Sequence, residues 1–260
     1  MKLYIYIYTY DRDIDLLEYC LKSTTRTKEH LLPGEEIVVT VVNDLHYGES
    51  LLTEEKALKL GADRYIETTF DRKGNLNGLA CVEGMLKVYT DNTPDDADFV
   101  MQLDSDCMLQ DIEWARMSKR HRAELAGQLI NRGDRSFPLL AALGAGMLLT
   151  KRLCKKLLAL LSNAEIRRRI DKGPGHSDVV LNVLTDMLRM CSVKYSYEDA
   201  PESNGKRIRM AQYYILGGIS NDKFLKESCI VHVDRFNVGN SHALVLKGMK
   251  EWYDKYVSHM

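Results

Sequence analysis

The sequence lacks the patterns that mark secreted, membrane-spanning or nucleic-acid-binding proteins. None of its six cysteines belongs to a C-x-x-C pair, which argues against a disulfide framework or a structural zinc site. No run approaches the roughly 20 apolar residues of a spanning helix, and the opening MKLYIYIYTYDRD is too short an apolar run for a signal peptide. With Lys+Arg 36 against Asp+Glu 37, there is no basic field to hold nucleic acid. These absences predict a cytoplasmic protein with unpaired thiols, no transmembrane segment and no nucleic-acid partner.

What the chain does have is an alternation of strand and helix patterns in residues 1–110. Apolar, β-branched or aromatic runs predict strands at Leu3–Thr9, Ile37–Val42, Arg64–Thr68 and Phe99–Leu103. Helical spacing follows Asp13, a plausible N-cap, and recurs at 51–60 and Leu76–Tyr89. This order predicts an α/β fold with a mostly parallel sheet and helices on both of its faces.

The alternation loosens after residue 110. We expect helices at 112–126, 151–170, 177–191 and Ser241–Tyr256, an apolar stretch at Pro138–Thr150, and extended segments at Arg207–Leu216 and Ile230–Val233. Composition shows no linker or internal repeat. A chain of 260 residues that is 45% hydrophobic can therefore form a single domain, 1–260, with a nucleotide-binding half (1–110) and an acceptor-binding half (111–260).

The strongest local motif is the pair Asp104 and Asp106, one residue apart and directly after a buried strand. Ligands of parallel sheets gather at the carboxyl ends of the strands. Two neighbouring carboxylates repel each other unless a cation lies between them, and Mg²⁺ or Mn²⁺ would keep open positions for phosphate oxygens. A solvated turn capped by aspartates is the alternative interpretation. We favour a divalent cation held by Asp106, with Asp104 supporting the cation or contacting a ribose.

Polar groups also follow the first two predicted strands. Thr9-Tyr10-Asp11-Arg12 follows the first, and Asn43-Asp44 follows the second. Tyr10 could offer a flat surface to a base, and Asp44 could accept a hydrogen bond from a base or ribose. Helix capping by Asp11 or Asp13 and an Asx turn at Asn43-Asp44 explain the same residues without a ligand.

Two further residues are candidates for chemistry in the second half. Asp178 begins a predicted helix after Gly173-Pro174-Gly175, so it could serve as a general base for an incoming hydroxyl or simply act, like Ser177, as an N-cap. His232 lies in an apolar strand and is either a core residue or a ligand that completes the same cation site.

The order of these motifs resembles the glycosyltransferase A-type fold and, within it, the family-2 nucleotide-sugar glycosyltransferases. The similarity extends from Tyr8 to about Phe236 and rests on IYTYDRDIDLLEYCLKS, VVNDLHYGES, FDRKGNLNGLACVEGM, QLDSDCML, LGAGMLLTKRL and GHSDVVLNVLT. The chain departs from that family in two places: Ser177 replaces the usual Glu, and VVNDLHYGES lacks the usual Asp-Asp-Gly-Ser motif.

The resemblance implies a Rossmann-like nucleotide-binding half merged with an acceptor-binding half. It implies that Thr9 and Tyr10 touch the nucleotide, that Asp44 binds the base, and that Arg72, Lys73 and Asn77 lie near the diphosphate. It also implies transfer from a nucleotide-diphosphate sugar to a carbohydrate or other hydroxyl acceptor, with Mn²⁺ or Mg²⁺ and inversion through Asp178. UDP is favoured and GDP comes next; Asp44 can accept the ring N–H of uracil, whereas cytosine offers a lone pair at that nitrogen.

Three other functions fit parts of the pattern. A nucleotidyltransferase acting on a sugar phosphate would share the fold, but usually has glycine in the turn that here reads Thr9-Tyr10-Asp11-Arg12. A phosphohydrolase with a D-x-D nucleophile carries that motif on its first strand, whereas here it follows the fourth. A non-catalytic nucleotide- or sugar-binding module would bind the donor without turnover.

Overall fold

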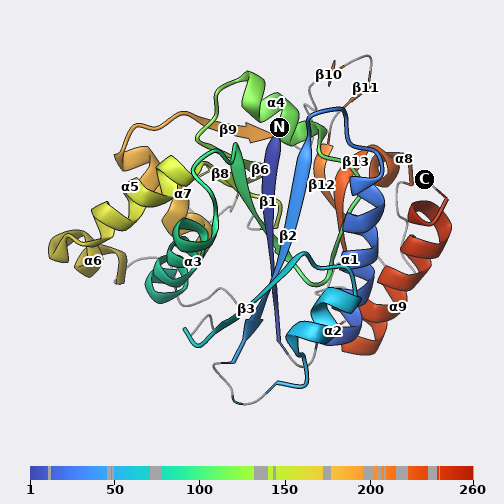
Figure 1. The fold of residues 1–260 in the computed structure, drawn as a ribbon. Helices are drawn as coiled ribbons and strands as arrows, with labels where there is room; N and C mark the ends of the chain where they lie inside the picture. The colour runs from blue at the N-terminus through green and yellow to red at the C-terminus, as the bar shows by residue number, and fades with distance from the viewer. Residues whose placement is uncertain are drawn as a thin grey trace.

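The computed structural model describes most of the chain. It covers residues 1–10, 13–45, 48, 50–70, 78–131, 140–142, 145–171, 177–195, 202–203, 206–207, 209–214, 222–233, 239 and 241–259. The first half alternates as predicted: β1 (Lys2–Thr9), α1 (Ile14–Lys28), β2 (Glu36–Asp44), α2 (Glu54–Lys59), β3 (Arg64–Thr68), α3 (Gly78–Asn92) and β4 (Phe99–Asp104). The fold is a mixed α/β fold (Figure 1).

The second half mixes short strands with helices. Its elements are β5 (Cys107–Leu109), α4 (Glu113–Arg120), β6 (Leu125–Asn131), β7 (Leu140–Ala142), β8 (Leu148–Leu149), α5 (Lys151–Leu161), α6 (Ala164–Asp171), α7 (Ser177–Met187), β9 (Ser192–Tyr195), β10 (Glu202–Ser203), β11 (Lys206–Arg207), β12 (Arg209–Tyr214), α8 (Asp222–Lys226), β13 (Ser228–Val233), α9 (His242–Trp252) and the π-helical turn Tyr253–Val257.

One sheet joins the two halves, in the order β3-β2-β1-β4-β8-β6-β7 with β9 beside β6. The strands β1 to β4 run parallel, whereas β8 is antiparallel to both β4 and β6. A second, three-stranded sheet has the order β12-β13-β5. Because β5 follows β4 after two residues, the small sheet begins at the carboxyl edge of the large one.

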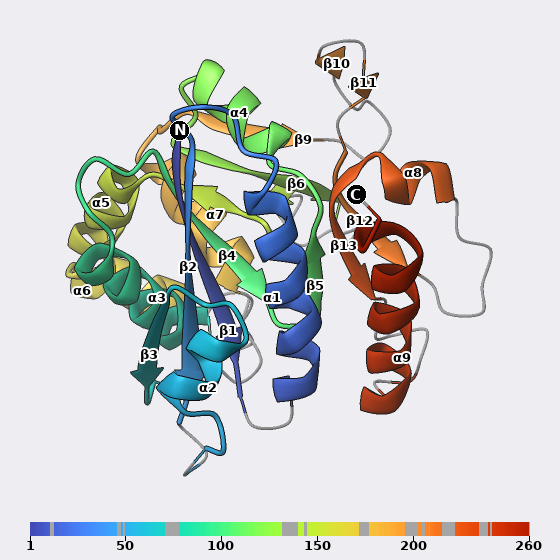
Figure 2. The ribbon, with the colours of Figure 1, turned by 45° about the vertical axis from the view of Figure 1, so that its right-hand side comes forward.

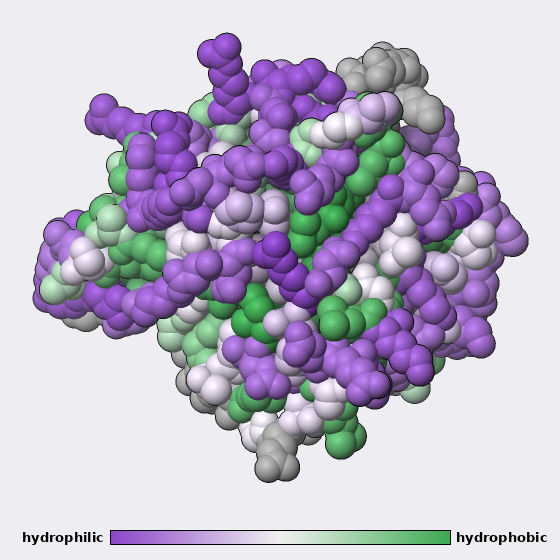
Figure 3. Space-filling view, in the orientation of Figure 1, coloured by the Kyte–Doolittle hydropathy of each residue, from purple (hydrophilic) through white to green (hydrophobic). Residues whose placement is uncertain are grey.

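The central strand β1 is buried on both faces, as its unbroken apolar run predicts. Leu3, Ile5 and Ile7 belong to the core cluster on the side of α1, α4 and α9, and the alternate tyrosines pack toward α3, α5 and α7. Figure 2 shows these two helical layers on opposite faces of the sheet. On the side of the molecule seen in Figure 1, hydrophilic side chains predominate around several apolar patches (Figure 3).

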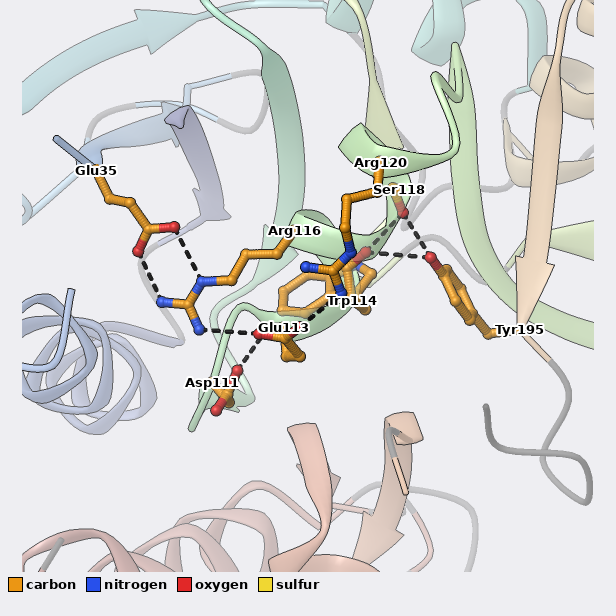
Figure 4. Close-up of polar contacts among 8 residues, drawn as sticks. All are labelled: Glu35, Asp111, Glu113, Trp114, Arg116, Ser118, Arg120 and Tyr195. Atoms are coloured by element: carbon orange, nitrogen blue, oxygen red, sulfur yellow. Dashed lines mark hydrogen bonds and ion pairs between the residues drawn. The ribbon is translucent and has the colours of Figure 1, made fainter. Parts of the chain in front are cut away.

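A partly buried ion-pair network ties α4 to the start of β2 (Figure 4). Arg116 donates to both carboxylate oxygens of Glu35 at 2.9 and 2.7 Å and to Glu113 at 3.1 Å. The hydrogen bond from Arg116 lowers the pKa of Glu35. Beside it, Ser118 and the buried Tyr195 share a hydrogen bond of 2.8 Å that joins α4 to β9.

Three expectations for the second half were wrong in detail. The helix expected at 112–126 ends at Arg120, because Arg122 adopts a left-handed φ of 53° and Leu125 begins β6. The helix expected at 151–170 is split after Leu161, and the Asn163 side chain caps α6 by accepting from the backbone N–H groups of Glu165 and Ile166.

The helix expected at 177–191 also ends early, at Met187, and Arg189 has a left-handed φ of 51°. The strand β9 follows. No helix in the described part of the chain is long and apolar enough to cross a membrane.

Candidate active site

The carboxyl edge of the large sheet carries four of the candidate residues: Thr9, Tyr10, Asp44 and Asp104. Thr9 ends β1 and is opposite Asn43 of β2, while Asp104 ends β4 and is opposite Tyr8. Thr9 is buried, and Tyr10 beyond it is 40% exposed. The parallel registers therefore bring the ends of β1, β2 and β4 together, as expected from the polar residues that follow them.

Asn43 and Asp44 have different surroundings at the end of β2. The buried Asn43 side chain donates to the Tyr65 hydroxyl at 2.8 Å and to the Leu52 carbonyl at 3.3 Å, and it accepts from Ser50 at 3.3 Å. Asn43 thus holds the segment after β2 in place. The half-buried Asp44 is the residue of this pair that remains a candidate for a ligand contact.

The pairing of β5 with β13 brings a distant histidine to the D-x-D motif. The two strands are antiparallel, with Cys107 opposite His232. His232 Nε2 consequently lies 3.1 Å from Asp106 Oδ1. The Asp106 carboxylate is only 6% exposed and the His232 imidazole 19% exposed, so both lie largely within the protein.

Potential ligand atoms of Asp106, Cys107 and His232 all lie within 4.8 Å of one another. The thiol differs from the other two groups, because burial, together with the charges of Asp106 and Asp104, raises the pKa of Cys107 well above its usual value. Cys107 is therefore a neutral thiol, and its sulfur lies 3.9 Å from Asp106 Oδ1. The group therefore offers a carboxylate oxygen, an imidazole nitrogen and a sulfur atom.

Several residues around the motif were not singled out from the sequence as part of the site. Gln102 Nε2 donates to Asp104 Oδ1 at 3.3 Å, and the buried Cys20 thiol donates to the Asp104 carbonyl at 3.7 Å. Gln102 lies two residues before Asp104 on the same strand, so the period of two in a strand could have placed both on one face. Cys20 had only the helical spacing of a core residue.

Asp178 is the second residue of α7, and the structure describes its backbone position only. The helix leads into β9, which is parallel to β6. Because β6 and β4 are both antiparallel to β8, β6 and β9 run in the same direction as β4. The first residues of α7 therefore lie toward the carboxyl edge that carries Asp104. Asp11, Arg12, Arg72, Lys73 and Asn77 lie outside the described residues.

The whole architecture is similar to that of solved glycosyltransferases. A structure of the galactosyltransferase LgtC in complex with donor and acceptor sugar analogues superposes with a TM-score of 0.58, at 13% identity over 97% of this chain and 99% of that chain. This chain has the glycosyltransferase A-type fold. An active-site mutant of LgtC gives a TM-score of 0.53 at 14% identity, over 89% of this chain and 87% of that one.

The likeness in three dimensions has no counterpart in sequence. No protein-family model matches the chain, and no curated protein matches it. At this level of identity the comparison confirms the A-type fold, while the resemblance to family 2 within that fold stays a prediction.

Proposed function

We propose that this protein transfers a sugar from a nucleotide-diphosphate donor to an acceptor hydroxyl with the help of a divalent cation. The observation that carries the proposal is the 3.1 Å contact between Asp106 and His232 at the carboxyl edge of an A-type fold. A simple turn after a strand would not require a contact between a buried carboxylate and an imidazole from a separate strand. Residues 1–110 would bind the nucleotide, and residues 111–260 would receive the acceptor.

The side chains at this edge fit a hard or borderline cation. Asp106, Asp104 and His232 offer oxygen and nitrogen atoms, which suit Mn²⁺ or Mg²⁺. Cys107 lies in the same group and adds a sulfur atom beside these oxygen and nitrogen atoms. When bound, the cation would neutralise charge that develops on the departing diphosphate.

Residues at the ends of β1 and β2 would orient the nucleotide. Tyr10 and Asp44 would flank the base, Thr9 would contact the nucleotide backbone, and Asp104 would support the cation or contact the ribose. UDP is favoured, with GDP next, and CDP is disfavoured because the Asp44 carboxylate can accept the uracil N–H but finds a lone pair at the same position of cytosine. By resemblance, Asp11 and Arg12 would lie beside the nucleotide, and Arg72, Lys73 and Asn77 would contact the diphosphate.

The acceptor would enter from the side of α7. Asp178, at the start of this helix, would take the proton of the attacking hydroxyl, which predicts inversion at the anomeric carbon. The acceptor class is a carbohydrate or another hydroxyl compound. All six cysteines are free thiols, which agrees with a cytoplasmic location and is the reason that we propose one.

Thermal unfolding in the presence of nucleotides tests the proposal most directly. We expect UDP to raise the melting temperature in Mn²⁺ but not in EDTA, since a ligand at a hundred times its dissociation constant adds about 2.7 kcal/mol of stability. Uridine without phosphates is the control. A chain that no nucleoside diphosphate stabilises in Mn²⁺ is not the donor-dependent transferase proposed here, and stabilisation without any donor turnover would indicate a binding module.

A further inference from the structure

Asp13 is a buried carboxylate that does not cap its own helix. It occupies the N-cap position of α1, yet its side chain makes no capping hydrogen bond there. Instead Asp13 Oδ2 accepts a hydrogen bond of 3.2 Å from the Ser105 hydroxyl. Both residues are at most 4% exposed. Burying a carboxylate costs free energy unless the carboxylate is paired. The groups that contact Asp13 therefore indicate what it does.

Ser105 is the residue between Asp104 and Asp106. A hydrogen bond to its side chain therefore acts on the turn that carries both aspartates. The bond also joins residues far apart in the sequence, since Asp13 begins α1 and Ser105 follows β4. The carboxyl ends of β1 and β4 are neighbours, and Asp13 links the loops that leave these two strands.

A histidine of α9 lies beside Asp13, close to its other carboxylate oxygen. His242 Nδ1 lies 3.5 Å from Asp13 Oδ1, and its Nε2 lies 2.8 and 2.9 Å from the two carboxylate oxygens of Asp15. His242 is the first residue of α9, which packs along α1. Two histidines of the C-terminal part of the chain thus reach the motif, His232 directly at Asp106 and His242 through Asp13 and Ser105.

We propose that Asp13 is a positioning residue for the D-x-D motif, holding Ser105 so that Asp104 and Asp106 keep their arrangement before a cation arrives. The inference rests on the proposed function, because it assigns the purpose of this contact to cation binding. Two neighbouring carboxylates repel each other. A turn that Asp13 already holds in one conformation avoids part of the free-energy cost of ordering the two carboxylates when a cation binds. Loss of such outer contacts typically lowers metal affinity 10- to 100-fold.

The first experiment needs no metal. Hydrogen exchange of the peptide spanning 103–109 is compared between the wild type, Asp13→Ala, Ser105→Ala and the control Asp15→Ala. Ser105→Ala removes only one hydroxyl, so it stays informative if Asp13→Ala unfolds. We expect faster exchange at the motif in Ser105→Ala and Asp13→Ala, and wild-type exchange in Asp15→Ala, which loses a His242 contact but keeps the bond to Ser105.

The second experiment measures Mn²⁺ affinity by calorimetry on the same proteins. We expect Ser105→Ala and Asp13→Ala each to weaken binding by about 10- to 100-fold, and the double variant to be no weaker than Asp13→Ala, since both changes break one contact. Wild-type exchange in both variants, or affinities within twofold of the wild type, overturns the inference. If the wild type itself binds no Mn²⁺, the proposed cation site fails, while the exchange comparison still decides whether Asp13 positions the turn.

Discussion

Asp106 is the first residue to test as a cation ligand, since its buried carboxylate faces His232 and it lies in the turn after β4. Asp106→Ala should abolish Mn²⁺-dependent binding of UDP, and Asp106→Asn should weaken it severely, because the amide keeps the shape but loses the charge. Calorimetric titration of UDP in Mn²⁺ and in EDTA measures this. Asp91→Ala, which removes an exposed aspartate at the end of α3, is the control. Tight UDP binding by the Asp106→Ala variant in Mn²⁺ would contradict the metal assignment.

Asp44 bears on the choice of base. Uracil presents a ring N–H that a carboxylate can accept, whereas cytosine has a lone pair at the same position. UDP should therefore bind more tightly than CDP in Mn²⁺, and Asp44→Ala should reduce the difference. Titration of UDP and CDP into the wild type and Asp44→Ala decides this. Tighter binding of CDP to the wild type would show that Asp44 does not accept a hydrogen bond from the base.

The thiols of the native protein should differ sharply in reactivity. Cys191 is exposed, and the other five are buried. Burial raises the pKa of Cys20 and Cys107 well above the usual value, and that of Cys154 to about 12, so these thiols stay protonated. A colorimetric thiol reagent at pH 8 should titrate one thiol per native chain and six after unfolding in urea. Fast reaction of several thiols in the native protein would contradict the burial of five of the six cysteines.

Among the elements, α4 depends on the pair formed by Arg116 and Glu35. Hydrogen bonding to Arg116 lowers the pKa of Glu35 in the folded state. The pair therefore stabilises the protein fully above the unfolded-state pKa of about 4.3, and its contribution is lost as the pH falls through the lower folded-state pKa. Glu35→Gln should cost about 1–3 kcal/mol at pH 7.

Urea unfolding at several pH values measures this cost, and the gap between variant and wild type should close as the pH falls below about 4. Glu18→Gln is the control. Glu18 forms an exposed pair with Lys22, where about 0.5 kcal/mol or less is expected. Equal losses in the two variants would mean that the Arg116 pair is no stronger than a surface contact.

The helix α7 carries the candidate base. Asp178→Asn should preserve donor binding and lower the transfer rate by roughly 10²- to 10⁴-fold, because the amide cannot take the proton of the attacking hydroxyl. Asp186→Asn, on an exposed position of the same helix, should keep the wild-type rate. Product configuration is read by NMR. Retention of the donor's anomeric configuration, or a fast Asn variant, would leave Asp178 as an N-cap and point to the departing diphosphate as the proton acceptor.

At the scale of the molecule, the first half of the fold could be predicted and much of the second could not. The long apolar runs of β1, β2 and β4 identify strands buried on both faces, and the polar residues at their ends identify the edge where they meet. The strands β5 and β9 have only three and four residues, so their sequences carry no detectable period. They exist because β13 and β6 offer partners, and a partner distant in sequence leaves no local pattern.

The same limit applied to the site. His232 was a candidate ligand from its place in an apolar strand, but its contact with Asp106 depends on the register between β5 and β13. The sequence did not predict the contact of Asp13 with Ser105, since an aspartate directly before a helix usually caps that helix. Local propensity placed Asp13 at the right position and assigned its side chain the wrong partner.

The pairing of β5 with β13 also sets the order in which the candidate site is assembled during synthesis. Asp104 and Asp106 leave the ribosome well before His232 and α9, which follow them by more than a hundred residues. A nascent chain can assemble β1 to β4 and still lack the histidine side of its site. Completion of the candidate cation site therefore has to wait until β13 has been made, since contacts of such long sequence separation form late. Fragments that stop before β13 would therefore contain Asp104 and Asp106 but lack the histidine side of the candidate cation site.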